Sequence, residues 1–318
     1  MTTVILLVLK ASIISTVFAI GLKATLTDAT FLFRRPGHCL RALLSMHVLM
    51  PLVALAIAAP FDLQPAVKIA LVVLSVSPTP PILPKKALKA GGAEAYTIGL
   101  LVTTAALSIM VIPLSMKVFE RVTGVPLAMR AGAVTSLVFA TVLTPLLAGI
   151  VVRRLTPAGA DRMSGRISVA ATVLLMTAAV PIMIGLAGTL VSVMTAGTLL
   201  SLTVFALAGL LVGHLLGGPE SDNRPVLALA TASRHPAVAL AIAHGNFPNQ
   251  SLVAPEVALY LILGGVLSSL YLSWSARKRH GGSEAARRVA RGVAEGKVDT
   301  MAREAAMASV TSKRNGGE

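Results

Sequence analysis

The sequence Val76-Ser77-Pro78-Thr79-Pro80-Pro81-Ile82-Leu83-Pro84-Lys85-Lys86 interrupts an apolar run, Ala66 to Ala90, that is long enough to cross a bilayer. Its four prolines prevent an unbroken α-helix, because each lacks an N–H group and clashes with the carbonyl four residues earlier. Hydrocarbon supplies no water to the released carbonyls, so such backbone must be buried in protein or line a wet cavity. The stretch therefore predicts a helix broken within the membrane, as in the binding sites of secondary transporters. A structural kink or a short soluble loop is the alternative.

The composition of the 318-residue chain is that of an all-α polytopic membrane protein, since 55% of the residues are hydrophobic, 13% are charged and the mean hydropathy is +0.81. This excludes disorder and a soluble globular domain. The single cysteine, Cys39, excludes an internal disulfide and a cysteine-cluster metal site, and no cofactor is expected. We expect a transmembrane transporter domain over residues 1–275 and a basic cytoplasmic tail over residues 276–318.

Nine apolar segments approach the roughly 20 residues needed to span a bilayer. The expected crossings are residues 3–22, 38–59, 66–90, 94–118, 130–153, 165–187, 196–217, 224–246 and 254–275. The basic residues that give the net charge of +15 gather in alternate loops and in the tail, as the positive-inside rule requires. The N-terminus is therefore predicted outside and the C-terminus in the cytoplasm, in a bacterial inner membrane.

The distribution of positive charge also sets the expected partners. It follows membrane topology, which argues against nucleic-acid binding, and no obligate protein partner is predicted. The tail either lies as a basic helix against anionic lipid headgroups or is solvated. Membrane lipid and a small anionic solute are the expected partners.

A second interrupted segment lies five helices after the first. Between Arg224 and Ala241 the sequence places Arg234-His235-Pro236 between two apolar runs. Five is an odd number of helices, so two repeats of that length have opposite orientations in the membrane. This arrangement predicts inverted repeats, with a binding site near the midplane where the two broken helices, about 66–90 and 224–246, meet.

The chain resembles the bile acid:sodium symporter family over nearly the whole hydrophobic part. The segments that carry the resemblance are Gly21 to Asp28 with Arg34-Arg35-Pro36, Met46 to Leu52, Ser77 to Gly92, and Ala230 to Ala241. The resemblance implies two inverted five-helix repeats, divided into core and panel subdomains, with the first helix of the family missing here. It also implies sodium-coupled symport of an organic anion.

The residues that the resemblance aligns with sodium ligands depart from the family pattern. A Ser-Asn pair of the family becomes Leu83-Pro84, a Glu and a Gln become approximately Leu229 and Ser233, and a Gln becomes His47. Thr97 matches a position where the family places a hydroxyl ligand. The candidate coupling-ion residues are therefore His47, Thr97 and Ser233. Sodium needs oxygen ligands, commonly including a carboxylate, so a different coupling mechanism enters as an alternative.

Arg234 carries the most unusual charge in the sequence, because a charged side chain near the bilayer centre costs several kcal/mol. It requires a partner or a wet cavity. The acidic residues Glu94, Glu220 and Glu256 are expected near helix ends, away from this depth. We therefore predict that fixed cations replace bound sodium and attract an anion, aided by the helix N-termini after the breaks.

The predicted substrate-binding residues all lie at or beside one of the two interruptions. They are Thr79, Pro80, Lys85, Lys86, Arg234 and His235. In the alternative interpretation, Arg234 caps carbonyls of the first broken helix and the two lysines extend to the cytoplasmic interface.

The predicted function is secondary active transport of a small organic anion by alternating access, and the chain is not predicted to be an enzyme. Sodium is the coupling ion implied by the resemblance. A proton is the alternative, since His47 or His235 can titrate near physiological pH. An uncoupled anion carrier, a channel and a membrane enzyme are further alternatives. The enzyme would rely on Ser233 beside His235, where no carboxylate is placed to orient the imidazole.

Overall fold

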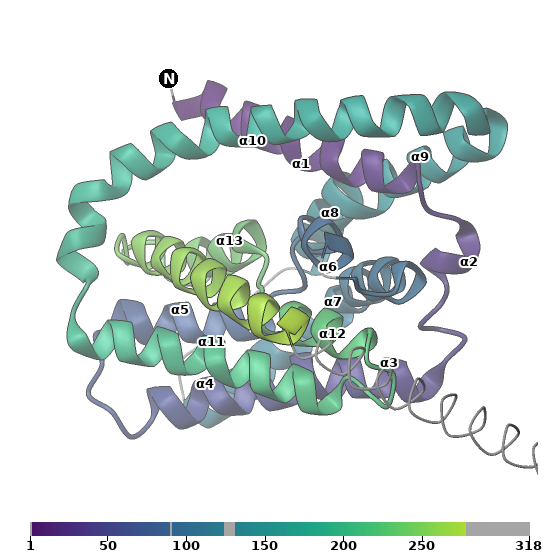
Figure 1. Cartoon of the computed structure of the whole chain (residues 1–318). Helices are drawn as coiled ribbons and strands as arrows, with labels where there is room; N and C mark the ends of the chain where they lie inside the picture. The colour runs from purple at the N-terminus through teal and green to yellow at the C-terminus, as the bar shows by residue number, and fades with distance from the viewer. Residues whose placement is uncertain (1, 90, 124–130, 278–318) are drawn as a thin grey trace, which may run out of the picture. The chain divides into compact units, whose positions relative to one another are not determined.

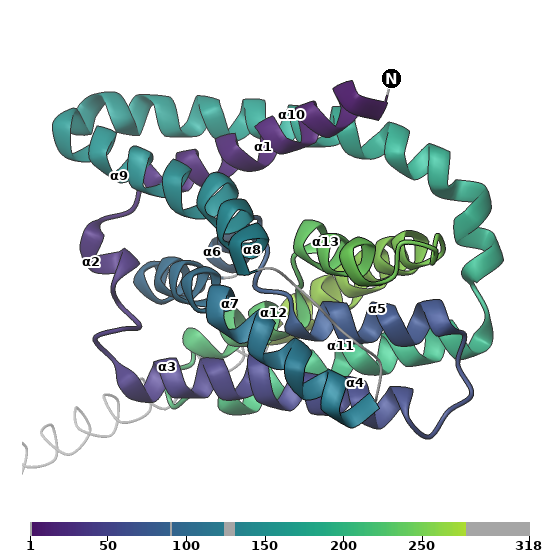
Figure 2. The same cartoon turned by 180° about the vertical axis from the view of Figure 1, so that it is seen from behind.

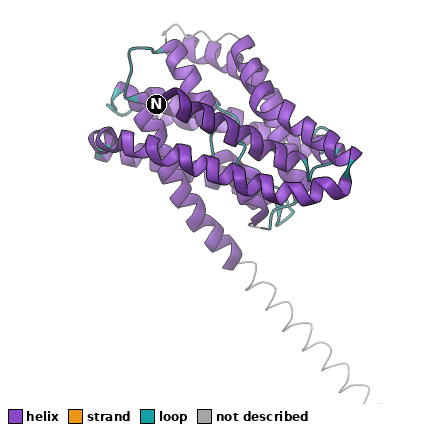
Figure 3. Ribbon diagram, turned by 90° about the horizontal axis from the view of Figure 1, so that it is seen from above, coloured by secondary structure: helices purple, strands orange, loops and turns teal. Residues whose placement is uncertain are grey.

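The described residues are entirely helical in their regular structure. The structure is a computed structural model that describes residues 2–89, 91–123 and 131–277, and no strand occurs in these ranges (Figure 3). Seven helices are long and apolar enough to cross a membrane, namely Pro36–Ala58, Glu94–Arg121, Thr135–Leu155, Pro157–Val193, Ala196–Leu216, Asn223–Asn246 and Val253–Arg277. This confirms an all-α membrane protein. The count of nine crossings stays a prediction.

The two other predicted crossings, 3–22 and 66–90, fall on shorter apolar helices. The first corresponds to α1 (Thr2–Gly21), and the second to α5 (Pro65–Val76) followed by α6 (Leu83–Lys89). The chain divides into two compact units, Met1–Ser269 and Leu270–Glu318, and the sites described below lie in the first. Of the predicted tail, 276–318, all but the first two residues lie outside the described part of the chain.

The remaining elements follow in chain order. They are α2 (Leu26–Ala29), α3 (Pro36–Leu43), η1 (Leu44–Leu49), α4 (Met50–Ala58), α7 (Glu94–Thr123), α8 (Ala131–Val138), η2 (Phe139–Leu143), α9 (Thr144–Leu155), α10 (Pro157–Val193), α11 (Ala196–Leu216), α12 (Asn223–Ala232) and α13 (Pro236–Asn246). Both π-helical turns, η1 and η2, end just before a helix with a proline in its first turn, Pro51 or Pro145. Proline removes one N–H from the helical ladder, so the preceding turn widens instead of ending the helix.

Both predicted interruptions are present. We call residues 77–82, between α5 and α6, the first break, and residues 233–235, between α12 and α13, the second break. Ser77 is extended, with ψ 141°, as expected for a residue that precedes proline. At the second break Ser233 is extended with ψ 131°, and His235 is extended in front of Pro236, the first residue of α13.

The packing of the helices brings the two broken helices together. α13 packs against α5, α12 packs along α11, and α1 packs against α9 and α10 (Figures 1 and 2). A large apolar cluster joins α5 to α13 through buried side chains that include Val73 and Leu74 on one helix and Val238 and Ile242 on the other. The close packing of these side chains holds α5 and α13 together, because helices in a membrane associate through van der Waals contact. The inverted repeats and the core and panel subdomains stay predictions.

Candidate anion site at the crossing of two broken helices

The two breaks are joined by hydrogen bonds. The backbone N–H of His235 donates to the carbonyl of Pro78 over 2.9 Å, and Nη1 of Arg234 donates to the carbonyl of Ser77 over 3.1 Å. The helical partner of the Ser77 carbonyl would be the N–H of Pro81, which has none. The Pro78 carbonyl lacks a helical partner because it lies within the non-helical break. The second break therefore satisfies acceptors that the first break exposes. The sequence prediction that the two broken helices meet is confirmed.

Arg234 is fully buried, and its guanidinium is only partly satisfied. Besides Ser77, Nη1 lies 3.5 Å from the carbonyl of Met46 in the π-helical turn η1. The other two nitrogens, Nε and Nη2, have no hydrogen-bond partner within the described residues. The alternative interpretation from the sequence, in which Arg234 caps the first broken helix, thus accounts for Nη1. The edge formed by Nε and Nη2 has no partner among the described residues.

A cavity of about 180 Å³ opens beside Arg234. Three parts of the chain line it: the first break with α6, the second break with the adjoining ends of α12 and α13, and the helix Val253–Arg277. The lining residues are Pro80, Ile82, Leu83, Lys86, Ala232, Ser233, Arg234, Pro236, Tyr260, Leu261, Gly264 and Gly265. Two of these side chains, Arg234 and the half-buried Lys86, are cationic. An engineered apolar cavity of roughly 150 Å³ holds a benzene molecule, so the space suits a small organic ion.

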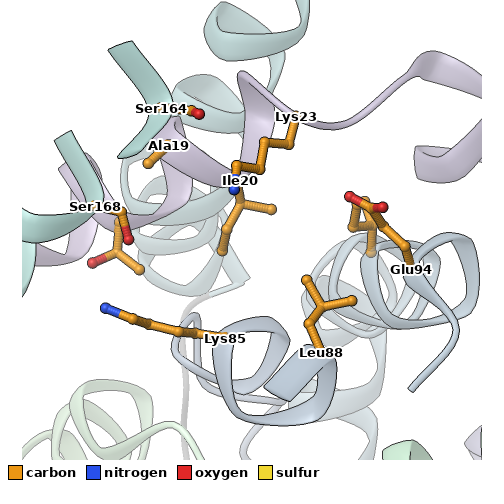
Figure 4. A pocket seen from close by; sticks show the side chains of 10 residues that line it. Ala19, Ile20, Lys23, Lys85, Leu88, Glu94, Ser164 and Ser168 are labelled. Carbon is orange, nitrogen blue, oxygen red and sulfur yellow. The ribbon is translucent and has the colours of Figure 1, made fainter. Parts of the chain in front are cut away.

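Lys85 belongs to a different cavity. That cavity, of about 100 Å³, lies between α1, α6, α7 and α10, where Lys23, Lys85 and Glu94 extend from three different segments (Figure 4). Nζ of Lys85 donates to Oγ1 of Thr172 in α10 over 2.5 Å. Consecutive residues of a helix point about 100° apart, so Lys85 and Lys86 face two separate spaces. The structure brings Lys86 to Arg234 and leaves Lys85 apart from it.

The two predicted threonines differ in the range of their contacts. Thr79, in the first break, is buried and pairs with Thr104 of α7 through hydroxyl oxygens 2.7 Å apart. The hydroxyl of Thr104 donates to Leu100 of its own helix, so Thr79 is the donor in the pair. Thr97 donates to the carbonyl of Ala93, one turn earlier in the chain. Thr79 therefore links the first break to α7, whereas Thr97 satisfies itself locally.

The ring nitrogens of the two predicted histidines are buried and form no hydrogen bond with the described residues. Both ring nitrogens of His47, in η1, and of His235, in the second break, lack partners within the described ranges. The coupling-ion candidates His47, Thr97 and Ser233 lie on three separate elements, and of these only Ser233 lines the Arg234 cavity. The part of the chain that the structure describes holds no group of three His, Cys, Asp or Glu side chains that could bind a metal ion.

Two buried residues of the helix Val253–Arg277, Tyr260 and Glu256, were not predicted to be site residues. The hydroxyl of Tyr260 donates to the carbonyl of Ala232, the last residue of α12, and Tyr260 lines the Arg234 cavity. Glu256, one turn earlier, lies near the start of its helix as expected, and its side chain is fully buried, which the sequence did not indicate. The spacing of Glu256 and Tyr260 by four residues in an apolar helix was the available signal, because it places both on one face.

Residues 11–193, more than half of the chain, match the model of the sodium bile acid symporter family. The chain belongs to this family. It is therefore a membrane transporter protein by family, and the predicted resemblance is confirmed. The matched region contains the first break, whereas the second break, with Arg234, lies beyond it. A comparison with curated proteins finds none that matches this chain.

Proposed function

We propose that this member of the sodium bile acid symporter family is a secondary carrier that moves a small organic anion by alternating access, with Arg234 as a fixed positive charge where the family uses bound sodium. The observation that carries the proposal is the half-satisfied guanidinium of a fully buried arginine beside a cavity. Burying a cation is costly unless a counter-charge and hydrogen bonds compensate it. An anion in the cavity supplies both.

The geometry of the unpaired edge favours a carboxylate or a sulfonate. Nε and Nη2 lie on the same edge of the guanidinium plane, and this edge binds two oxygens of one anionic group through two parallel hydrogen bonds. Nη1, which is bound to Ser77, points away from that edge. A bidentate anion therefore completes the guanidinium without displacing the contact that holds the two breaks together.

The rest of the cavity favours a short apolar body on the anion. Leu83, Ile82 and Leu261 line it together with the ring of Tyr260, and Lys86 adds a second positive charge. None of the described residues that line this cavity is acidic. Two cations and no carboxylate oppose the binding of sodium within the cavity, and this supports an anion there in preference to the sodium coupling that the family implies.

Thermal unfolding of the purified protein tests the binding step. We expect benzoate and benzenesulfonate to raise the unfolding temperature equally in sodium and in choline salts, because a ligand of the folded state stabilises it according to its occupancy. In Arg234→Met the affinity should fall by about 30-fold or more, since loss of one partner of a buried charge pair costs ~2–5 kcal/mol. Arg224→Met is the matched control, because Arg224 lies in α12 but is exposed and contacts Gly218. Stabilisation by sodium alone, or unchanged affinity in Arg234→Met, would contradict the proposal.

The two neighbouring lysines give a second test of the cavity. Lys86→Met should weaken benzenesulfonate binding, because Lys86 lines the Arg234 cavity, and Lys85→Met should not. The two residues share a helix and are both half-buried, so they differ mainly in the cavity they face. Equal effects of the two substitutions would argue against this cavity as the binding site. Saturable counterflow of labelled benzenesulfonate in proteoliposomes would distinguish a carrier from a channel.

A further inference from the structure

Glu256 is the one acidic residue in the described ranges whose side chain is fully buried. Both of its carboxylate oxygens lack a hydrogen-bond partner among the described residues. An ionised carboxylate in such surroundings pays a desolvation cost that nothing offsets. These surroundings therefore favour the neutral, protonated acid over the ionised carboxylate.

Glu256 lies one helical turn from Tyr260, which contacts the end of α12 beside the second break. Glu256 and Tyr260 lie four residues apart, so they share a face of the helix Val253–Arg277. The hydroxyl of Tyr260 donates to Ala232, two residues before Arg234, and the ring packs on Phe205 of α11 with centroids 5.6 Å apart. One helical turn thus separates Glu256 from a residue that lines the anion cavity.

Val253, Val257 and Tyr260, on the helix of Glu256, belong to one apolar cluster with residues of several other helices. The titratable side chains on or beside those helices include Lys68 in α5, His47 in η1, His214 in α11, His235 and His244 at the two ends of α13, Glu94, Lys117, Glu120 and Arg121 in α7, and Asp161, Arg162 and Arg166 in α10. His244 is exposed, and Lys68 is half-buried. On its own helix the nearest titratable group is Tyr260. The strongest buried charge near the crossing is therefore the guanidinium of Arg234.

We propose that Glu256 is the coupling site of the carrier, and that its ligand is a proton which moves together with the anion bound at Arg234. This inference rests on the proposed function. The step is a simple protonation: a proton from water on one side of the membrane binds one carboxylate oxygen and leaves to water on the other side. One monovalent anion and one proton then cross together, so the overall transport is electroneutral.

Charge balance at the buried crossing makes the coupling obligatory. With both ligands bound, Glu256 is neutral and Arg234 is paired with the anion, so the site has no net charge. With neither bound, ionised Glu256 and Arg234 cancel each other. Either ligand alone leaves one uncompensated charge, positive with the proton and negative with the anion, and an uncompensated charge at membrane depth opposes the movement of the site.

Proton uptake on anion binding tests the site directly. Benzenesulfonate is the probe, because it stays anionic across the working pH range and carries no proton of its own. Added to the wild-type protein in weak buffer at neutral to mildly alkaline pH, it should raise the pH of the solution by up to one proton per anion bound. The Glu256→Gln protein should bind the probe and take up none. Binding of benzenesulfonate by the wild type without proton uptake would overturn the inference and leave the proposed function intact.

Transport by the Glu256→Gln protein gives a second test, because exchange and net uptake of benzenesulfonate should respond in opposite ways. Glutamine is neutral like the protonated acid, so the anion-loaded site should still move and exchange of benzenesulfonate should persist. The empty site then carries the lone charge of Arg234, so net uptake driven by an inward proton gradient should fall at least about tenfold. Glu120→Gln, in the last turn of α7, is the matched control and should keep both activities.

Three outcomes separate the inference from the proposed function. Net uptake in Glu256→Gln at the wild-type rate contradicts the coupling role, as does wild-type uptake that follows a sodium gradient and ignores a proton gradient. If the wild-type protein neither binds nor exchanges benzenesulfonate or benzoate, the proposed function itself is wrong. If Glu256→Gln unfolds, Glu256→Asp serves in its place, because it keeps the titrating group and should retain proton-driven uptake with a changed pH profile.

Discussion

The two breaks differ in the hydrogen-bonding groups that they present to each other. The first break is rich in proline and presents carbonyl acceptors, of which Ser77 and Pro78 are used by the second break. The second break is shorter, carries Arg234 and His235, and supplies the donors. Two interruptions that look alike as gaps in helices are thus chemically complementary. Of the residues within the two breaks, only Arg234 in the second break carries a fixed positive charge.

The helices that lead into the breaks are also held differently. α5 is held at the first break by apolar side chains such as Val73 and Leu74. α12 instead lies against the glycines of α11, where a Cβ on Gly213 would meet the Leu227 carbonyl oxygen at 2.5 Å and one on Gly209 would meet Cα of Ala232 at 2.9 Å. A contact between two helix backbones can adjust less to an added atom than a contact between side chains, which can change rotamer. We therefore expect the second break to be the more sensitive to small changes behind it.

The largest effect is expected from Gly213→Ala. The new methyl group has to displace the backbone of α12, so the substitution should destabilise the protein by ~1–3 kcal/mol and also weaken binding of benzenesulfonate. Gly185→Ala in α10 is the control: a Cβ there meets nothing within 4 Å, so the added helix propensity should be neutral or stabilise by up to about 1 kcal/mol. Thermal unfolding measures both. Equal behaviour of the two variants would show that α12 has room to move.

A smaller effect is expected from Tyr260→Phe. It removes the donor to the carbonyl of Ala232 at the end of α12 and leaves that buried acceptor unsatisfied, which should cost ~1–2 kcal/mol. The ring and its packing on Phe205 remain, so the cavity keeps its shape. Unfolding measurements with and without benzenesulfonate would separate a loss of stability from a loss of affinity. A variant as stable as the wild type would mean that water replaces the hydroxyl.

The sequence was informative where a residue type dictates the backbone and less so where packing decides. Proline dictates the first break, and Arg-His-Pro between apolar runs marks the second, so their positions could be predicted. The separation of Lys85 from Lys86 depends on which neighbours α6 faces, and no local pattern records that. Glu256 was placed near a helix end, which is correct, but its burial comes from elements distant in the sequence. Position along a helix indicates depth in a membrane and does not reveal what covers the side chain.

A paired substitution compares threonines at and away from the first break. Thr79→Val removes the hydroxyl contact with Thr104 and should cost about 1 kcal/mol, because a buried hydrogen bond between two elements is lost. Thr97→Val removes only a contact with Ala93, the residue before the start of the same helix, and its effect should be close to zero. Unfolding temperatures of the two variants provide the comparison. A strong effect of Thr97→Val on sodium-dependent uptake would instead favour the coupling role that the family resemblance implies.

The smallest effect is expected from His235→Leu, which distinguishes the backbone of the second break from its side chain. The bond to Pro78 comes from the N–H of His235, and leucine keeps that donor. The imidazole nitrogens have no partners in the described part of the chain, so their removal should leave stability unchanged or slightly higher. Proton-driven uptake of benzenesulfonate should also persist, because the proposed proton site is Glu256. Loss of proton dependence in His235→Leu, with folding intact, would move the coupling proton to the second break and make one element the source of both the fixed and the mobile charge.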